Sequence, residues 1–105
     1  MKKEKNMNDE IRTAKQMPRR VEKKTFGIIK SEKDLEKFVE NVLEAKATFV
    51  SWGETMDHNT ATACLVIKPN VMASVASMAR IGMSLNAIVC IGPLGDKMML
   101  LGLSW

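Results

Sequence analysis

The chain has 105 residues, a formal net charge of +4 at pH 7 and 46% hydrophobic residues, so it is the size of one domain with a modest core. We expect neither a signal peptide nor a membrane-spanning helix, because both the apolar leader segment and a run of roughly 18 apolar residues are missing. The cysteines, Cys64 and Cys90, lie in apolar strand-like runs, which predicts free buried thiols in a reducing compartment and therefore a cytoplasmic protein.

Positive charge is concentrated in residues 1–30, which contain ten Lys or Arg against four Asp or Glu. The sequence therefore divides into a basic arm over residues 1–30, which could be disordered, and a small α+β domain over residues 31–105. Next to Phe26 the arm carries a compact cluster of four basic residues: Arg19, Arg20, Lys23 and Lys24. Charges at this density bind phosphates without reading sequence, although a solvated tail has the same composition.

Local signals within the arm are weak. Asn8 or Asp9 is suited to cap a short helix over residues 10–16. Residues 21–30 place Phe26 and two isoleucines around a glycine. This pattern indicates either a short strand or a segment that becomes ordered only against another surface.

Residues 31–46 predict an amphipathic helix. Ser31 is a good N-cap, and acidic residues in the first turn suit the positive end of the helix dipole. Apolar residues then recur at the spacing of one helix face: Leu35, Phe38, Val39, Val42 and Leu43. We expect this face to pack on the rest of the domain.

Two β-hairpins and an intervening helix are predicted to follow. The first hairpin has a polar loop at residues 54–59, and the second turns at Pro93–Asp96. The helix between them covers residues 71–85. Strands are expected at residues 47–53, 60–68, 86–92 and 97–105. The order α-β-β-α-β-β predicts an α+β fold with a mainly antiparallel sheet.

The helix predicted at residues 71–85 contains one charged residue, Arg80, and is otherwise apolar or small. A helix on the outside of a monomer needs a polar face, which this helix lacks. The last two predicted strands are apolar on both faces, and this pattern is typical of strands that are covered on two sides. We therefore expect a homo-oligomer that shelters this helix. The alternative is a monomer in which the first helix and the basic arm cover it.

Residues with catalytic chemistry are scarce. His58, the only histidine, lies between Asp57 and Asn59. This group could hold a phosphate or act as a base, but the pattern favours a turn in which Asp57 or Asn59 bonds to nearby backbone. One histidine and two separated cysteines do not supply the three or four ligands of a metal site. We therefore expect no catalytic residue, metal or cofactor. The alternative is an enzyme whose active site lies between subunits.

Three functional hypotheses follow. The first is a non-enzymatic oligomer that sequesters or senses a small anionic, nucleotide-like ligand, a role that would suit a virus or mobile element. The ligand would lie in pockets between subunits formed by Arg80, Trp52, His58 and Asn59. The second is a nucleic-acid-binding module that uses the basic arm. The third is a small inhibitor that docks on a host protein through the apolar strands. No membrane partner is expected.

Overall fold

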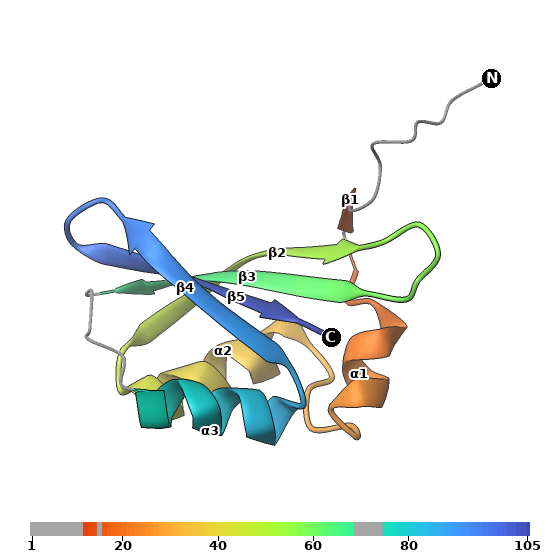
Figure 1. The fold of residues 1–105 in the computed structure, drawn as a ribbon, viewed down its shortest axis with the longest axis horizontal. Helices are drawn as coiled ribbons and strands as arrows, with labels where there is room; N and C mark the ends of the chain where they lie inside the picture. The colour runs from red at the N-terminus through yellow and green to blue at the C-terminus, as the bar shows by residue number, and fades with distance from the viewer. Residues whose placement is uncertain (1–11, 15, 69–74) are drawn as a thin grey trace.

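A computed structural model describes residues 12–14, 16–68 and 75–105. They form one antiparallel sheet with three helices on a single face, which confirms the predicted α+β class (Figure 1). The strands are β1 (Arg12–Ala14), β2 (Lys46–Glu54), β3 (Ala61–Lys68), β4 (Ile88–Leu94) and β5 (Met98–Ser104). The helices are α1 (Arg19–Lys24), α2 (Glu32–Leu43) and α3 (Val75–Leu85).

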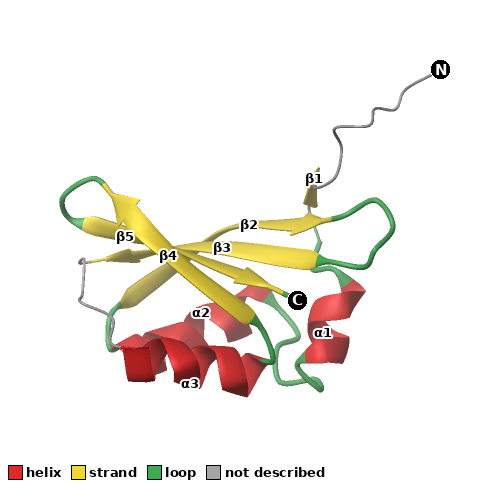
Figure 2. Ribbon diagram, in the orientation of Figure 1, coloured by secondary structure: helices red, strands yellow, loops and turns green. Residues whose placement is uncertain are grey.

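The sheet has the strand order β1-β2-β3-β5-β4. Both predicted hairpins are present, and β5 rather than β4 pairs with β3. After β3 the chain passes through α3 on the helical side of the sheet and re-enters it at the outer edge as β4 (Figure 2). The opposite face of the sheet is left bare by the described helices.

The core lies between the sheet and the helices, and strand alternation selects its residues. Odd-numbered residues of β3 and β5 point toward the helices and are buried: Ala61, Ala63, Leu65, Ile67, Met99, Leu101 and Leu103. Helix α2 contributes Leu35 and Val39, as its sequence pattern predicts, and Ser31 caps it by accepting from Asp34 N at 3.2 Å. The predicted amphipathic helix is therefore confirmed.

The basic segment departs from its two local predictions. The helix expected over residues 10–16 is wrong where the structure describes it, because residues 12–14 form β1 and pair with the end of β2. Of the two alternatives for residues 21–30, the short strand is wrong, because the start of this range belongs to α1 and the rest forms no strand. Val21 and Ile29 are fully buried, so the core extends back into the basic segment.

Two further differences are local. Residues 69–74 lie outside the described residues, so the predicted start of the second helix is not seen, and α3 is described from Val75. The turn expected at Pro93 begins after Leu94 instead. Proline is accommodated in β4 because an edge strand does not need every N–H in the sheet.

The two cysteines are free, but the prediction that both are buried is wrong, because Cys64 is half-buried and Cys90 is exposed. Cys90 pairs with Gly102 across β4 and β5, and Cys64 pairs with the same glycine across β3 and β5. Both thiols therefore lie on the bare face of the sheet. Burial, and then the neighbouring Cys90, raise the pKa of the half-buried Cys64 thiol above its ordinary value.

Helix α2 also protects the outer edge of β2. Beyond its short pairing with β1, this edge has no strand partner among the described residues. Glu36 accepts a hydrogen bond from Phe49 N at 2.7 Å, and Glu40 accepts one from Ala47 N at 2.9 Å. Occupied edge donors cannot pair with a strand of another chain, so two carboxylates on one helix face block this edge against β-pairing.

Candidate anion-binding site

A pocket opens where the start of α1 faces the loop between β2 and β3. Val21 anchors α1 in the core, which leaves Arg19 and Lys23, four residues apart, exposed on the helix surface. The pocket has a volume of about 870 Å³. Its lining residues are Gln16, Met17, Pro18, Arg19, Arg20, Lys23, Glu54 and His58.

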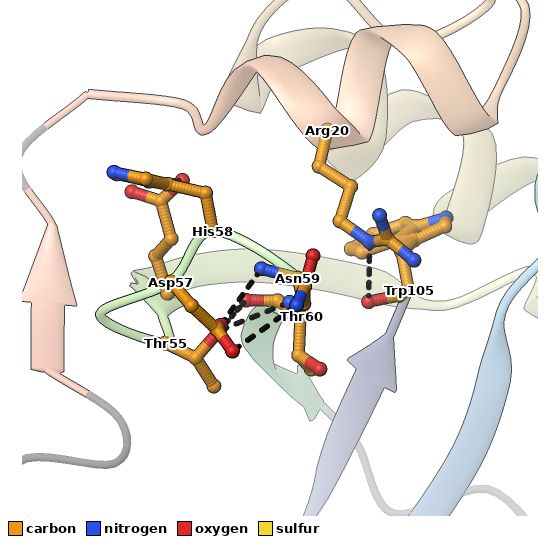
Figure 3. A network of polar contacts seen from close by, with 8 residues as sticks. Arg20, Thr55, Asp57, His58, Asn59, Thr60 and Trp105 are labelled. Atoms are coloured by element: carbon orange, nitrogen blue, oxygen red, sulfur yellow. Dashed lines mark hydrogen bonds and ion pairs between the residues drawn. The ribbon is translucent and has the colours of Figure 1, made fainter.

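The guanidinium group of Arg20 is fixed through one of its nitrogen atoms, Nε. Its Nε donates to the main-chain oxygen of Trp105 at 3.1 Å (Figure 3). Trp105 is itself fixed by main-chain hydrogen bonds with Ala61 and by its indole N–H, which donates to Leu85 O at 2.8 Å. The Nη donors of Arg20 have no partner among the described residues, so they are free to bind an anion at a fixed position.

The β2–β3 loop is a rigid turn rather than an open polar segment. Asp57 Oδ1 accepts from Thr55 Oγ1 at 2.7 Å and from Asn59 N at 3.0 Å. Asp57 Oδ2 accepts from Asn59 Nδ2 at 3.1 Å. The turn that the sequence predicts at Asp57 is thus present (Figure 3). These bonds, with that from Thr55 first, lower the pKa of Asp57 from its ordinary value.

The same turn sets the position of His58, which adopts a φ of 62°. Its Nδ1 lies 2.9 Å from Glu54 Oε2, four residues earlier in the chain. Among the described lining residues Glu54 is the only carboxylate, and α1 contributes three cations to the same lining. Three cations against one carboxylate leave the described lining with an excess of positive charge.

The structure brings together residues that the sequence assigned to different hypotheses. His58, predicted as part of a pocket between subunits, lies beside Arg19, Arg20 and Lys23 of the basic arm. Lys24, the fourth basic residue, instead lines a neighbouring groove along α3. Asn59 is in the same loop as His58, but its side-chain amide donates to Asp57.

The other two predicted ligand-binding residues lie elsewhere. Trp52 is buried, with its ring centroid 4.6 Å from that of Phe49, so it is a core residue and offers no stacking surface. Arg80 is exposed on α3 and does not line the pocket. A ligand site between subunits that contains Arg80 stays a prediction.

Sequence reasoning overlooked Glu54, Met17 and Pro18 as site residues. The spacing of Glu54 and His58 was the one available signal, since a hairpin loop can return residue 58 to residue 54. Within the described ranges, no three His, Cys, Asp or Glu side chains are placed to hold a metal ion. None of the described helices has the length and apolar character needed to cross a membrane. Comparisons with protein-family models, curated proteins and solved structures found no match.

Proposed function

We propose that this protein binds, without chemical turnover, a phosphate-bearing anion of nucleotide size in the pocket between α1 and the β2–β3 loop. The observation that carries the proposal is the convergence of Arg19, Arg20 and Lys23 on one pocket whose single described carboxylate is bound to His58. Guanidinium and ammonium groups form short, charge-assisted hydrogen bonds with phosphate oxygens. The volume of about 870 Å³ lies within the range of small-molecule sites.

Binding is favoured over catalysis because of the acid–base groups in the pocket. Among the described lining residues, His58 is the only imidazole and Glu54 the only carboxylate, and they bond to each other. The described lining offers no serine, threonine or cysteine as a nucleophile. An enzyme using His58 as a base would release product from a nucleotide or phosphate ester, and His58→Ala would abolish that release. We expect no release from the unaltered protein.

The proposal is tested by isothermal titration with inorganic phosphate, ADP, ATP and GTP at low salt. We expect binding of at least one of these compounds. Loss of one charge-assisted hydrogen bond of about 1.5–3 kcal/mol corresponds to roughly 10- to 100-fold weaker binding. We expect that loss for Arg20→Ala, whereas Arg80→Ala is a matched control outside the pocket and should bind normally. No binding by any of the four, or equal loss in both variants, would overturn the proposal.

A second candidate is a single-stranded nucleic acid that follows the same helix. Phe26 is 86% exposed and adopts a φ of 55°, which is unusual for a bulky side chain. It lies just beyond the C-terminal end of the six-residue helix α1, three residues after Lys23, and does not itself line the pocket. An exposed aromatic ring beside basic residues can stack on a base and contribute about 1–3 kcal/mol.

Point substitutions test this candidate better than deletion of residues 1–30, because that deletion would remove the buried Val21 and Ile29. Phe26→Ala should weaken binding of a short single-stranded oligonucleotide roughly 5- to 100-fold. It should leave mononucleotide binding unchanged. Electrophoretic mobility shifts at two salt concentrations provide the measurement. Equal oligonucleotide affinity of the variant and the unaltered protein would rule out a role for Phe26.

A further inference from the structure

The face of the sheet opposite the helices is uncharged over most of its area. Even-numbered residues of β3, β4 and β5 point to this face, and the pairing places them in rows across the sheet. One row contains Val66 and Leu100, and the next contains Cys64, Gly102 and Cys90. In β2 to β5 the charged residues stand only at strand ends: Lys46, Glu54 and Lys68.

Large apolar side chains on this face are open to solvent. Ile88 is 74% exposed, Val50 is 54% exposed and Leu100 is 37% exposed. Exposed large apolar side chains on one face of a soluble protein can mark an interaction site. An antiparallel sheet that faces water on one side normally alternates apolar and polar residues. The outer side of β5 has Met98, Leu100 and Gly102, and only Ser104 at its end is polar.

We propose that this sheet face binds the same face of a second copy of the chain in a two-fold symmetric dimer. A charged partner would lose solvation here without gaining an ion pair, whereas an identical uncharged face loses little. A two-fold interface also needs a surface that is complementary to itself. The face meets that need, because a ridge and a hollow lie side by side along β5.

The hollow has a volume of about 340 Å³ and centres on Gly102. Small side chains form its floor: a Cβ at Gly102 would lie 3.0 Å from Cys90 Sγ, so the thiol packs directly beside the glycine. The ridge is the adjacent row, with Leu100 and Val66 at its centre. Consider a two-fold axis that lies between the two sheets, parallel to both. If this axis runs perpendicular to β5 and passes over Leu101, it places each Leu100 over Gly102 of the second copy. The same rotation places each Val66 over Cys64 of the second copy.

The area of the face sets the expected strength of the dimer. Four strands about 4.8 Å apart, each about seven residues long at about 3.3 Å per residue, give a footprint of roughly 450 Å² per copy. This is below the roughly 800 Å² per partner of standard interfaces. The dimer is therefore in the weak class, with a dissociation constant in the micromolar range.

The structure favours this face over the helix that the sequence singled out. On α3 the described outer surface includes Met83, which is 82% exposed, but Arg80 interrupts it. Burying α3 against a second copy would desolvate Arg80 with no described carboxylate to pair it. The sheet face presents no such cost. The proposal does not rest on anion binding, since the described pocket lining contains none of the residues at the centre of this face.

Sedimentation velocity of the full chain over about 1–200 µM tests the dimer at the expected affinity. We expect the mass to rise toward twice the 11.7 kDa of one chain. Leu100→Lys should keep the mass at one chain, because the dimer would bury two ammonium groups. Met83→Lys, a matched control on α3, should dimerise normally. Circular dichroism of both variants reports whether they fold.

If Leu100→Lys does not fold, Val50→Lys replaces it as the test variant. As an independent measurement, the midpoint of thermal unfolding of the unaltered protein should rise with protein concentration. The reaction of Cys90 with a thiol reagent should also slow as concentration rises, since dimerisation covers it. A mass of one chain over the whole range would overturn the proposal. So would dissociation by Met83→Lys alone, which would place the interface on α3.

Discussion

Replacement of Thr25 by valine should loosen the helix that carries the basic pocket. Thr25 is fully buried just after α1; its hydroxyl donates to Val21 O at 2.7 Å and accepts from Ile29 N at 3.3 Å. Valine has almost the same shape but forms neither bond, and Ile29 N then has no acceptor among the described residues. A net hydrogen bond contributes about 1 kcal/mol, and an orphaned buried donor costs about 1–3 kcal/mol. We expect Thr25→Val to lower the free energy of unfolding by about 2–4 kcal/mol.

Urea unfolding followed by tryptophan fluorescence measures this change, because the buried Trp52 and Trp105 report on the core. Thr25→Ser is the control: it keeps the hydroxyl and loses one buried methyl group, at a cost of about 1 kcal/mol. Nucleotide affinity should fall in the valine variant and not in the serine variant, since α1 positions Arg19, Arg20 and Lys23. A valine variant within about 0.5 kcal/mol of the unaltered protein, with unchanged nucleotide affinity, would refute this account of α1.

Three further predictions concern the edge strand, a helix end and the β2–β3 loop. Glu40→Ala removes the acceptor of Ala47 N and should cost about 1–2 kcal/mol of unfolding free energy; no loss in urea unfolding would contradict it. Glu44 ends α2 with a φ of 55°, so Glu44→Gly should stabilise the protein by about 0.5–1 kcal/mol, and a lower thermal midpoint would show that this position is not strained. The pKa of Asp57 is lowered in the folded state, so its bonds are complete above the ordinary value of 3.8 and are lost as pH falls through the lower folded pKa. The midpoint of the pH titration of the Asn59 amide resonance should therefore lie below 3.8; a midpoint at or above 3.8 would disprove this.

The sequence was most informative where the determinants of structure are local. Ser31 and the apolar spacing of Leu35 and Val39 predict α2 because cap and face lie within a few turns of one another. The same holds for the hairpin loop, where Asp57 needs only its neighbours. The basic segment was misinterpreted because its buried residues, Val21, Thr25 and Ile29, are four apart but are separated by charged side chains and Gly27. Three apolar or weakly polar positions are too few to indicate a buried helix face in a segment rich in lysine and arginine.

The parts that could not be predicted depend on contacts between distant residues. In the sheet, β5 lies between β3 and β4 because the chain passes through α3 before it returns to the sheet. The residues of a single strand carry no signal for this path. The sequence identified the basic cluster and His58 separately, yet their meeting depends on Val21 docking α1 near the loop. Exposure of the bare sheet face likewise depends on all three helices packing on the other side.

The central claim, that α1 and the β2–β3 loop together hold a phosphate-bearing anion, is tested most directly by nuclear magnetic resonance. Titration of ATP into the ¹⁵N-labelled protein at low salt should shift backbone amides on both elements together, at Arg19, Arg20, Lys23 and His58. Amides around Arg80 on α3 should remain in place. Saturating shifts confined to α3, or no shifts at any amide, would contradict the account.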